Sequence, residues 1–124
     1  MNSKVSLSIR IVFGLFLLFF GANKIFHFMT PPPPPSDDAI AYWSALMTTH
    51  TMTLVAIVEI AAGLSLLFKK YVGLMMLILL SVSINAVLYH IALDPAQVAM
   101  AVVLLLLNVA VMYVHRNEYK SLLA

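Results

Sequence analysis

The chain alternates long apolar runs with short polar segments. The apolar runs cover residues 9–28, 52–68, 71–93 and 96–114. Each is close to the roughly 20 residues that an α-helix needs to cross a bilayer. The third run carries no formal charge and stops at Asp94 and Pro95, where the proline disfavours helix in the residue before it. The pattern therefore predicts four membrane-spanning helices.

The first run also begins like a secretory signal peptide, with Lys4 before it and Arg10 at its start. Its end favours a retained helix, because the bulky residues Phe26, His27 and Phe28 stand where a cleavage site has small residues. Three more apolar runs follow. We therefore expect residues 1–124 to form one all-α membrane domain, a four-helix bundle.

The composition excludes an ordinary soluble protein. Hydrophobic residues make up 63% of the chain and charged residues 10%, whereas a soluble domain is about 45–50% apolar and about a quarter charged. The lack of cysteine excludes disulfides, thiolate metal sites and iron–sulfur clusters. The net charge of +2 does not indicate nucleic-acid binding, because the basic residues adjoin apolar runs instead of forming one polar patch.

The basic residues predict an orientation. With four spans, six of the seven fall on the side of the termini: Lys4, Arg10, Lys69, Lys70, Arg116 and Lys120. Only Lys24 falls on the other side. Because cytoplasmic loops carry the excess of lysine and arginine, we expect both termini to be cytoplasmic. The short second and third connections predict that the last three spans are antiparallel neighbours.

The only long connection, residues 29–51, contains five consecutive prolines. Residues 31–35 should form a stiff extended strut. We favour a spacer, although such a run also serves as a docking ligand for aromatic grooves. Ser36, Asp37 and Asp38 then provide helix N-cap chemistry.

A short interfacial helix is expected over residues 37–50. Ile40, Trp43, Leu46 and Met47 fall on one face at helical spacing. Tyr42 and Trp43 are expected to anchor this helix in the membrane interface, over the outer end of the bundle.

Small residues mark the contact faces of the helices. Arg10, Gly14, Gly21 and Lys24 lie on one stripe of the first helix. Glycines let helix backbones approach closely in lipid, so this stripe should face protein, with Arg10 reaching toward the cytoplasm as a topology anchor. Gly63 lies on the face of the second span that also carries Glu59, and it should serve the same packing role.

Glu59 is the most informative residue, since charges within spans are costly and tend to face the bundle interior. It lies about eight residues into its helix, or roughly 12 Å at 1.5 Å per residue. At that depth the carboxyl group is either protonated or paired with a cation, and Lys24 is the cation placed to reach it. Two alternatives remain open: a buried group that only determines packing, or a role in binding a ligand, proton or substrate.

Other polar side chains belong to the same outer half of the predicted bundle: Asn23, His27, His50, Ser81, Asn85, Tyr89 and His90. Together they outline a polar pocket, although simple hydrogen bonding between helices also uses such residues. The candidate ligand-binding residues are Lys24, His27, Glu59, Asn85 and His90. No two histidines have the spacing of a metal motif, so no metal or haem site is expected. No catalytic motif or redox centre is present in the sequence, which leaves enzyme activity uncertain.

Several segments resemble the DoxX family of small four-helix bacterial membrane proteins, in its short form with a proline-rich first loop. They are residues 10–27, the prolines before Tyr42 and Trp43, residues 57–68 and residues 83–95. The most specific parts are the Asn23-Lys24 end of the first helix and Glu59 followed by Gly63. The resemblance implies a four-helix bundle in the bacterial inner membrane. It also implies association with quinone-linked redox complexes or with membrane-protein assembly.

Two classes of function follow as hypotheses. The resemblance favours an accessory or scaffold subunit of a membrane complex, with a membrane protein partner or a second copy beside it in the bilayer. The alternative is a small-molecule binder or transporter that uses Glu59, by analogy with small multidrug transporters, whose coupling depends on one buried carboxylate. A quinone or lipid headgroup in the outer pocket would refine the first hypothesis.

Overall fold

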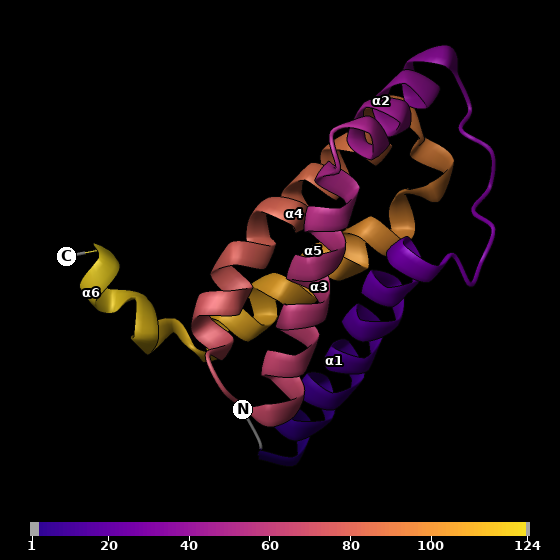
Figure 1. The fold of residues 1–124 in the computed structure, drawn as a ribbon. Coiled ribbons are helices and arrows are strands. Elements are labelled where there is room, and N and C mark those ends of the chain that lie inside the picture. Colours follow the sequence, from indigo (N-terminus) through magenta and orange to yellow (C-terminus); the bar gives the residue numbers. More distant parts are fainter. Residues whose placement is uncertain (1–2, 124) are drawn as a thin grey trace.

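The computed structural model describes residues 3–123, and these form helices joined by short connections (Figure 1). No strand occurs among the described residues. The long helices are α1 (Ser3–Phe26), α3 (Thr51–Phe68), α4 (Val72–Leu93) and α5 (Val98–Val114). The short ones are α2 (Asp37–Thr48) and α6 (Lys120–Leu123), with 3-10 turns at Pro95–Gln97 and Arg116–Tyr119.

The structure confirms the predicted all-α membrane bundle. Four segments are long and apolar enough to cross a membrane: α1, α3, α4, and the 3-10 turn together with α5. The second and third spans agree with prediction within one residue. The first helix starts six residues earlier than predicted, because residues 3–8 contain no proline or glycine to stop it.

Each long helix packs against the next long helix along the chain. α1 packs most extensively against α3, α3 also packs against α4, and α4 packs against α5 (Figure 1). The last three spans are therefore neighbours, as their short connections predicted. We call the end where α1 begins and α3 turns into α4 the tail end. The opposite end, which carries α2 and the proline segment, is the loop end.

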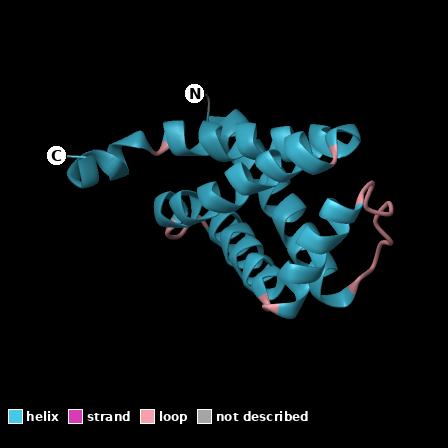
Figure 2. Ribbon diagram, turned by 90° about the horizontal axis from the view of Figure 1, so that it is seen from above, coloured by secondary structure: helices cyan, strands magenta, loops and turns pink. Residues whose placement is uncertain are grey.

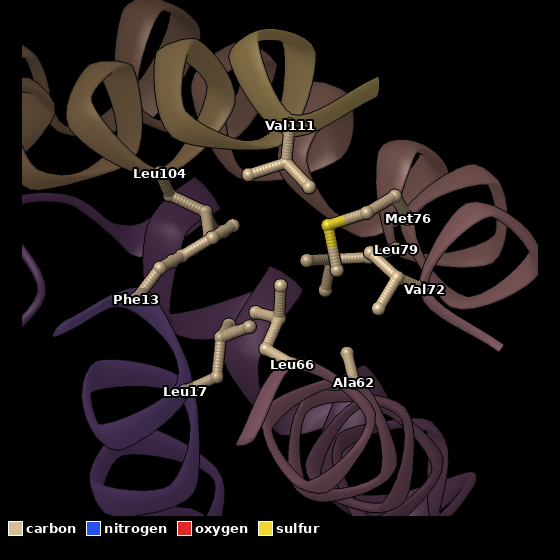
Figure 3. Packing of buried hydrophobic residues seen from close by; sticks show 9 residues of the cluster. All are labelled: Phe13, Leu17, Ala62, Leu66, Val72, Met76, Leu79, Leu104 and Val111. Carbon is tan, nitrogen blue, oxygen red and sulfur yellow. The ribbon is translucent and has the colours of Figure 1, made fainter. Parts of the chain in front are cut away.

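The hydrophobic core draws on all four long helices and lies mainly toward the tail end. Its buried side chains point toward one another between the helices (Figure 3). They are Phe13, Leu17, Ala62, Leu66, Val72, Met76, Leu79, Leu104 and Val111. Asn108 is also fully buried there, and it accepts a hydrogen bond from Ser83 Oγ (2.7 Å) and donates one to the Met76 carbonyl (3.0 Å).

The predicted glycine stripe forms the contact between α1 and α3. A Cβ on Gly63 would lie 2.8 Å from the Gly14 carbonyl oxygen and 3.1 Å from the backbone nitrogen of Leu18. Gly14 and Gly21 are buried on the matching face of α1. Arg10 belongs to this contact too, because its Nη1 donates a hydrogen bond to the Leu66 carbonyl near the end of α3 (3.0 Å).

The proline segment leaves α1 and follows the outside of the molecule to α2 (Figure 2). Residues 31–35 are exposed and form no helix. Ser36 caps α2, as predicted, by accepting a hydrogen bond from the Ala39 backbone N–H (3.1 Å).

The apolar face of α2 that helical spacing predicted is only partly buried. Ile40 and Met47 on that face are 52% and 50% exposed. The buried residue is Ala39, and Trp43 and Leu46 are half-buried. The aromatic side chains of α2 contact α4, and hydrophobic spacing along α2 alone does not reveal these contacts.

The segment after α5 turns back against the start of α4 before α6 extends sideways from the tail end (Figure 1). The Tyr119 hydroxyl donates a hydrogen bond to the Gly73 carbonyl (2.7 Å). Burial raises the pKa of this phenol above its ordinary value, and the nearby Glu118 carboxylate adds to the effect. Tyr119 therefore remains a hydrogen-bond donor at neutral pH.

We predict that Gly63→Ala destabilises the bundle, because the new methyl group collides with the α1 backbone. Overpacking of this kind costs about 1–3 kcal/mol. The matched control is Gly73→Ala, where a Cβ meets only the flexible end of Glu118. SDS-induced unfolding followed by circular dichroism measures both. Equal stabilities of the two variants would contradict the backbone contact.

Candidate functional site

The site begins with an ion pair between α1 and α3. Lys24 Nζ lies 2.7 Å from Glu59 Oε1, so the structure has the ion pair, which is one of the two states that the sequence left open for Glu59. The Glu59 side chain is 3% exposed and that of Lys24 is 25% exposed. Lys24 occupies the last turn of α1, and Glu59 lies in the middle of α3.

Gly21 makes this pairing possible. It lies about one turn before Lys24, and a Cβ on it would lie 3.2 Å from Glu59 Cβ and 3.1 Å from the Ala56 carbonyl oxygen. The two backbones are therefore close enough for the lysine side chain to run beside α3. The glycine stripe thus positions the charged groups as well as packing the helices.

The ion pair borders a cavity of about 320 Å³ at the loop end, which we call the loop-end cavity. All four long helices and α2 contribute to its walls. The polar or aromatic lining residues are Lys24, Tyr42, Trp43, Thr51, Glu59, Ser81, Asn85, Tyr89 and His90. The apolar ones are Leu46, Met52, Val55, Val82, Ala86 and Leu104. A volume of this size lies within the range of small-molecule sites, about 300–1,000 Å³.

Two hydrogen bonds hold α2 against α4 over this cavity. Trp43 Nε1 donates to the Tyr89 hydroxyl (2.6 Å), and Asn85 Nδ2 donates to the Tyr42 hydroxyl (2.6 Å). The rings of Tyr42 and Tyr89 also stack, with their centroids 4.8 Å apart. Tyr42 and Trp43, predicted as interface anchors, therefore form part of the cavity wall. α2 covers the cavity as a lid.

Four of the five candidate ligand-binding residues line the loop-end cavity: Lys24, Glu59, Asn85 and His90. His27 does not. The helix α1 ends at Phe26, and His27 takes the left-handed conformation (φ 55°) and is exposed. The Asn23 side chain stabilises this exit by accepting a hydrogen bond from the Met29 N–H (2.8 Å). The chain therefore leaves the bundle where a continuing helix was expected.

His50 also lies outside the cavity lining. It precedes α3 in the left-handed conformation (φ 61°) and is exposed. Within residues 3–123, no three His, Cys, Asp or Glu side chains are grouped so that they could hold a metal ion.

Sequence reasoning missed part of the lining. Tyr42 and Trp43 were assigned to the membrane interface, and Leu46, Met52 and Leu104 gave no polar signal. The polar face of α4 was predicted, because Ser81, Asn85 and Tyr89 recur every four residues. That face predicts a polar surface on α4 but not the helix that covers it.

The lining offers hydrogen-bond donors and acceptors at one place and apolar walls around them. Lys24 supplies ammonium protons, Glu59 a carboxylate, and Asn85 an amide. Such a site can hold a molecule with an apolar body and a polar headgroup.

Comparisons of the chain with protein-family models, with curated proteins and with solved structures found no match. The DoxX resemblance therefore remains a prediction, and the geometry of the loop-end cavity carries the functional argument.

Proposed function

We propose that the chain is a membrane-embedded binding protein for a small amphipathic molecule, which it holds in the loop-end cavity. The observation that carries this proposal is the Lys24–Glu59 pair in the wall of an open space of about 320 Å³. The polar headgroup would lie at this pair and at His90. The apolar body would lie against Val55, Val82 and other aliphatic lining residues.

The placement of the pair supports binding over packing alone. A buried ion pair is weak evidence for stability, because desolvation offsets most of the attraction between its charges. In a membrane bundle such charges commonly mark pathways or ligand sites. The Lys24 side chain is a quarter exposed and lines the cavity, so its ammonium group is accessible to a ligand. A pair retained only for packing gains nothing from that exposure.

A short-chain quinone is a suitable first probe, because it joins an apolar ring to two carbonyl acceptors. The chain contains a single tryptophan, Trp43, which lines the cavity and reports occupancy by fluorescence. We expect saturable quenching in the purified protein. Ala86→Phe should abolish it by filling the cavity, whereas Ala99→Phe, on an exposed position of α5, should not.

The same titration is carried out on the variant Glu59→Gln. It removes the carboxylate that orients Lys24, and we expect the affinity to fall about tenfold, equivalent to about 1.4 kcal/mol. A flat titration of the wild type, or equal loss in the two phenylalanine variants, would contradict binding in the cavity. Unchanged affinity in Glu59→Gln would exclude the carboxylate from the site, and with it transport that uses this group.

An accessory or scaffold subunit of a membrane complex, including a quinone-linked redox complex, is the second candidate function. The observation in its favour is that the DoxX-like motifs coincide with the site, since Lys24 and Glu59 line the cavity and Gly63 packs against α1. We expect purification from native membranes in mild detergent to recover a defined partner protein. Repeated recovery of the chain alone at native abundance would argue against this role.

We also propose that the protein resides in the bacterial inner membrane with its tail end in the cytoplasm. The tail end carries Lys69 and Lys70 in the α3–α4 connection and Arg116 and Lys120 after α5. The loop end carries Asp37 and Asp38 at the start of α2. This charge difference supports the orientation, because basic residues accumulate on the cytoplasmic side.

The absence of cysteine allows a direct test of orientation. Asp38→Cys and Lys120→Cys each add one thiol at an exposed position, one at each end of the bundle. We expect a membrane-impermeant maleimide to label Asp38→Cys in intact spheroplasts, and Lys120→Cys only after permeabilisation. The reverse pattern would invert the proposed orientation.

A further inference from the structure

A second hollow lies at the tail end, away from the loop-end cavity. It is an open groove of about 660 Å³ between α3 and α4. Its lining includes Leu64, Ser65, Phe68, Lys70, Tyr71 and Leu74. Phe68 and Tyr71 are 71% and 75% exposed, so large apolar surfaces stand open at its mouth. We call it the tail-end groove.

A basic turn lies beside the tail-end groove. Lys69 and Lys70 are both exposed, and Lys70 lines the groove itself. Among the described residues, the ion pairs are Lys24–Glu59 and His115–Glu118, and neither includes these two lysines. The Glu118 carboxylate lies against the buried Gly73 and does not line the groove.

The backbone holds this turn in one conformation. Lys69 and Tyr71 are both left-handed, with φ values of 53° and 59°. The Ser65 carbonyl accepts hydrogen bonds from the backbone N–H groups of Lys69 and Lys70, and the Ser65 hydroxyl donates one to the Lys70 carbonyl. The backbone of this turn therefore fixes where the side chains of Lys69 and Lys70 begin, next to the apolar groove.

We propose that the tail-end groove binds an anionic phospholipid of the surrounding membrane. Its acyl chains lie against Leu64, Phe68 and Leu74, and its phosphate meets Lys69 and Lys70. Acyl chains alone would not select among lipids, because hydrocarbon fills any groove in a bilayer. Selection comes from the phosphate and the added negative charge of the headgroup, which two lysines without carboxylate partners complement.

The lysine side chains suit this role. Their aliphatic stems can lie along the apolar groove while the ammonium groups reach the headgroup level. Each lysine near an anionic membrane surface contributes about a fivefold gain in affinity. Removing both should therefore weaken the preference for anionic lipid by roughly tenfold or more.

The test uses the full-length purified protein and native mass spectrometry. Phosphatidylglycerol and phosphatidylcholine with identical acyl chains are added separately at equal concentration. We expect one phosphatidylglycerol to be retained in preference to phosphatidylcholine. The double variant Lys69→Gln/Lys70→Gln should lose that preference, and the double variant Lys4→Gln/Lys120→Gln, with the same net charge, should keep it.

A second pair of variants tests the apolar part of the groove without changing charge. Leu64→Trp should displace the lipid by filling the groove, whereas Leu106→Trp, on an exposed position of α5, should not. Equal retention of both lipids by the wild type, or equal loss in the two lysine variants, would overturn the proposal. It would also be overturned by a lipid-free dimer that Leu64→Trp dissociates, since the groove would then hold a second copy of the chain.

Discussion

The close contact between α1 and α3 is the constraint on which the rest of the structure depends. Glycines at positions 14, 21 and 63 let the backbones of the two helices approach closely. In lipid no hydrophobic force drives helices together, so close packing of this kind must supply the association. The same contact brings Lys24 of one helix to Glu59 of the other at 2.7 Å. The contact between α1 and α3 therefore both packs the bundle and positions the charged pair.

The two ends of the bundle differ as a consequence. Toward the tail end, large side chains from four helices fill the interior, and Asn108 satisfies its amide within it. Toward the loop end the interior is not filled, and a separate helix, α2, covers the space. The tail end is therefore packed, and the open volume lies at the loop end. This division supports a binding role at the loop end.

Polar groups within the spans are used in two ways. Asn108 accepts a hydrogen bond from Ser83 and donates one to the Met76 carbonyl. These groups are buried, and their role is structural. Lys24 and Glu59 instead border open space, and Asn85 and Tyr89 connect that space to its lid. Unpaired polar groups are costly in hydrocarbon. Lys24 and Glu59 border open space, so their hydrogen-bonding capacity is the part that a ligand can use.

The sequence by itself determined the four spans, the Ser36 cap and the glycine stripe, because hydropathy, capping and helical spacing are local properties. It also identified Lys24 as the cation that could reach Glu59. It did not determine which residues of α2 are buried, the exit of the chain at His27, or the contacts of Tyr42 and Trp43 with α4. Those depend on how separate helices are turned toward one another, and residues 43 and 89 meet only in the folded chain. The candidate residues Lys24 and Glu59 were therefore predictable, whereas their pairing and the cavity around them were decided by tertiary structure.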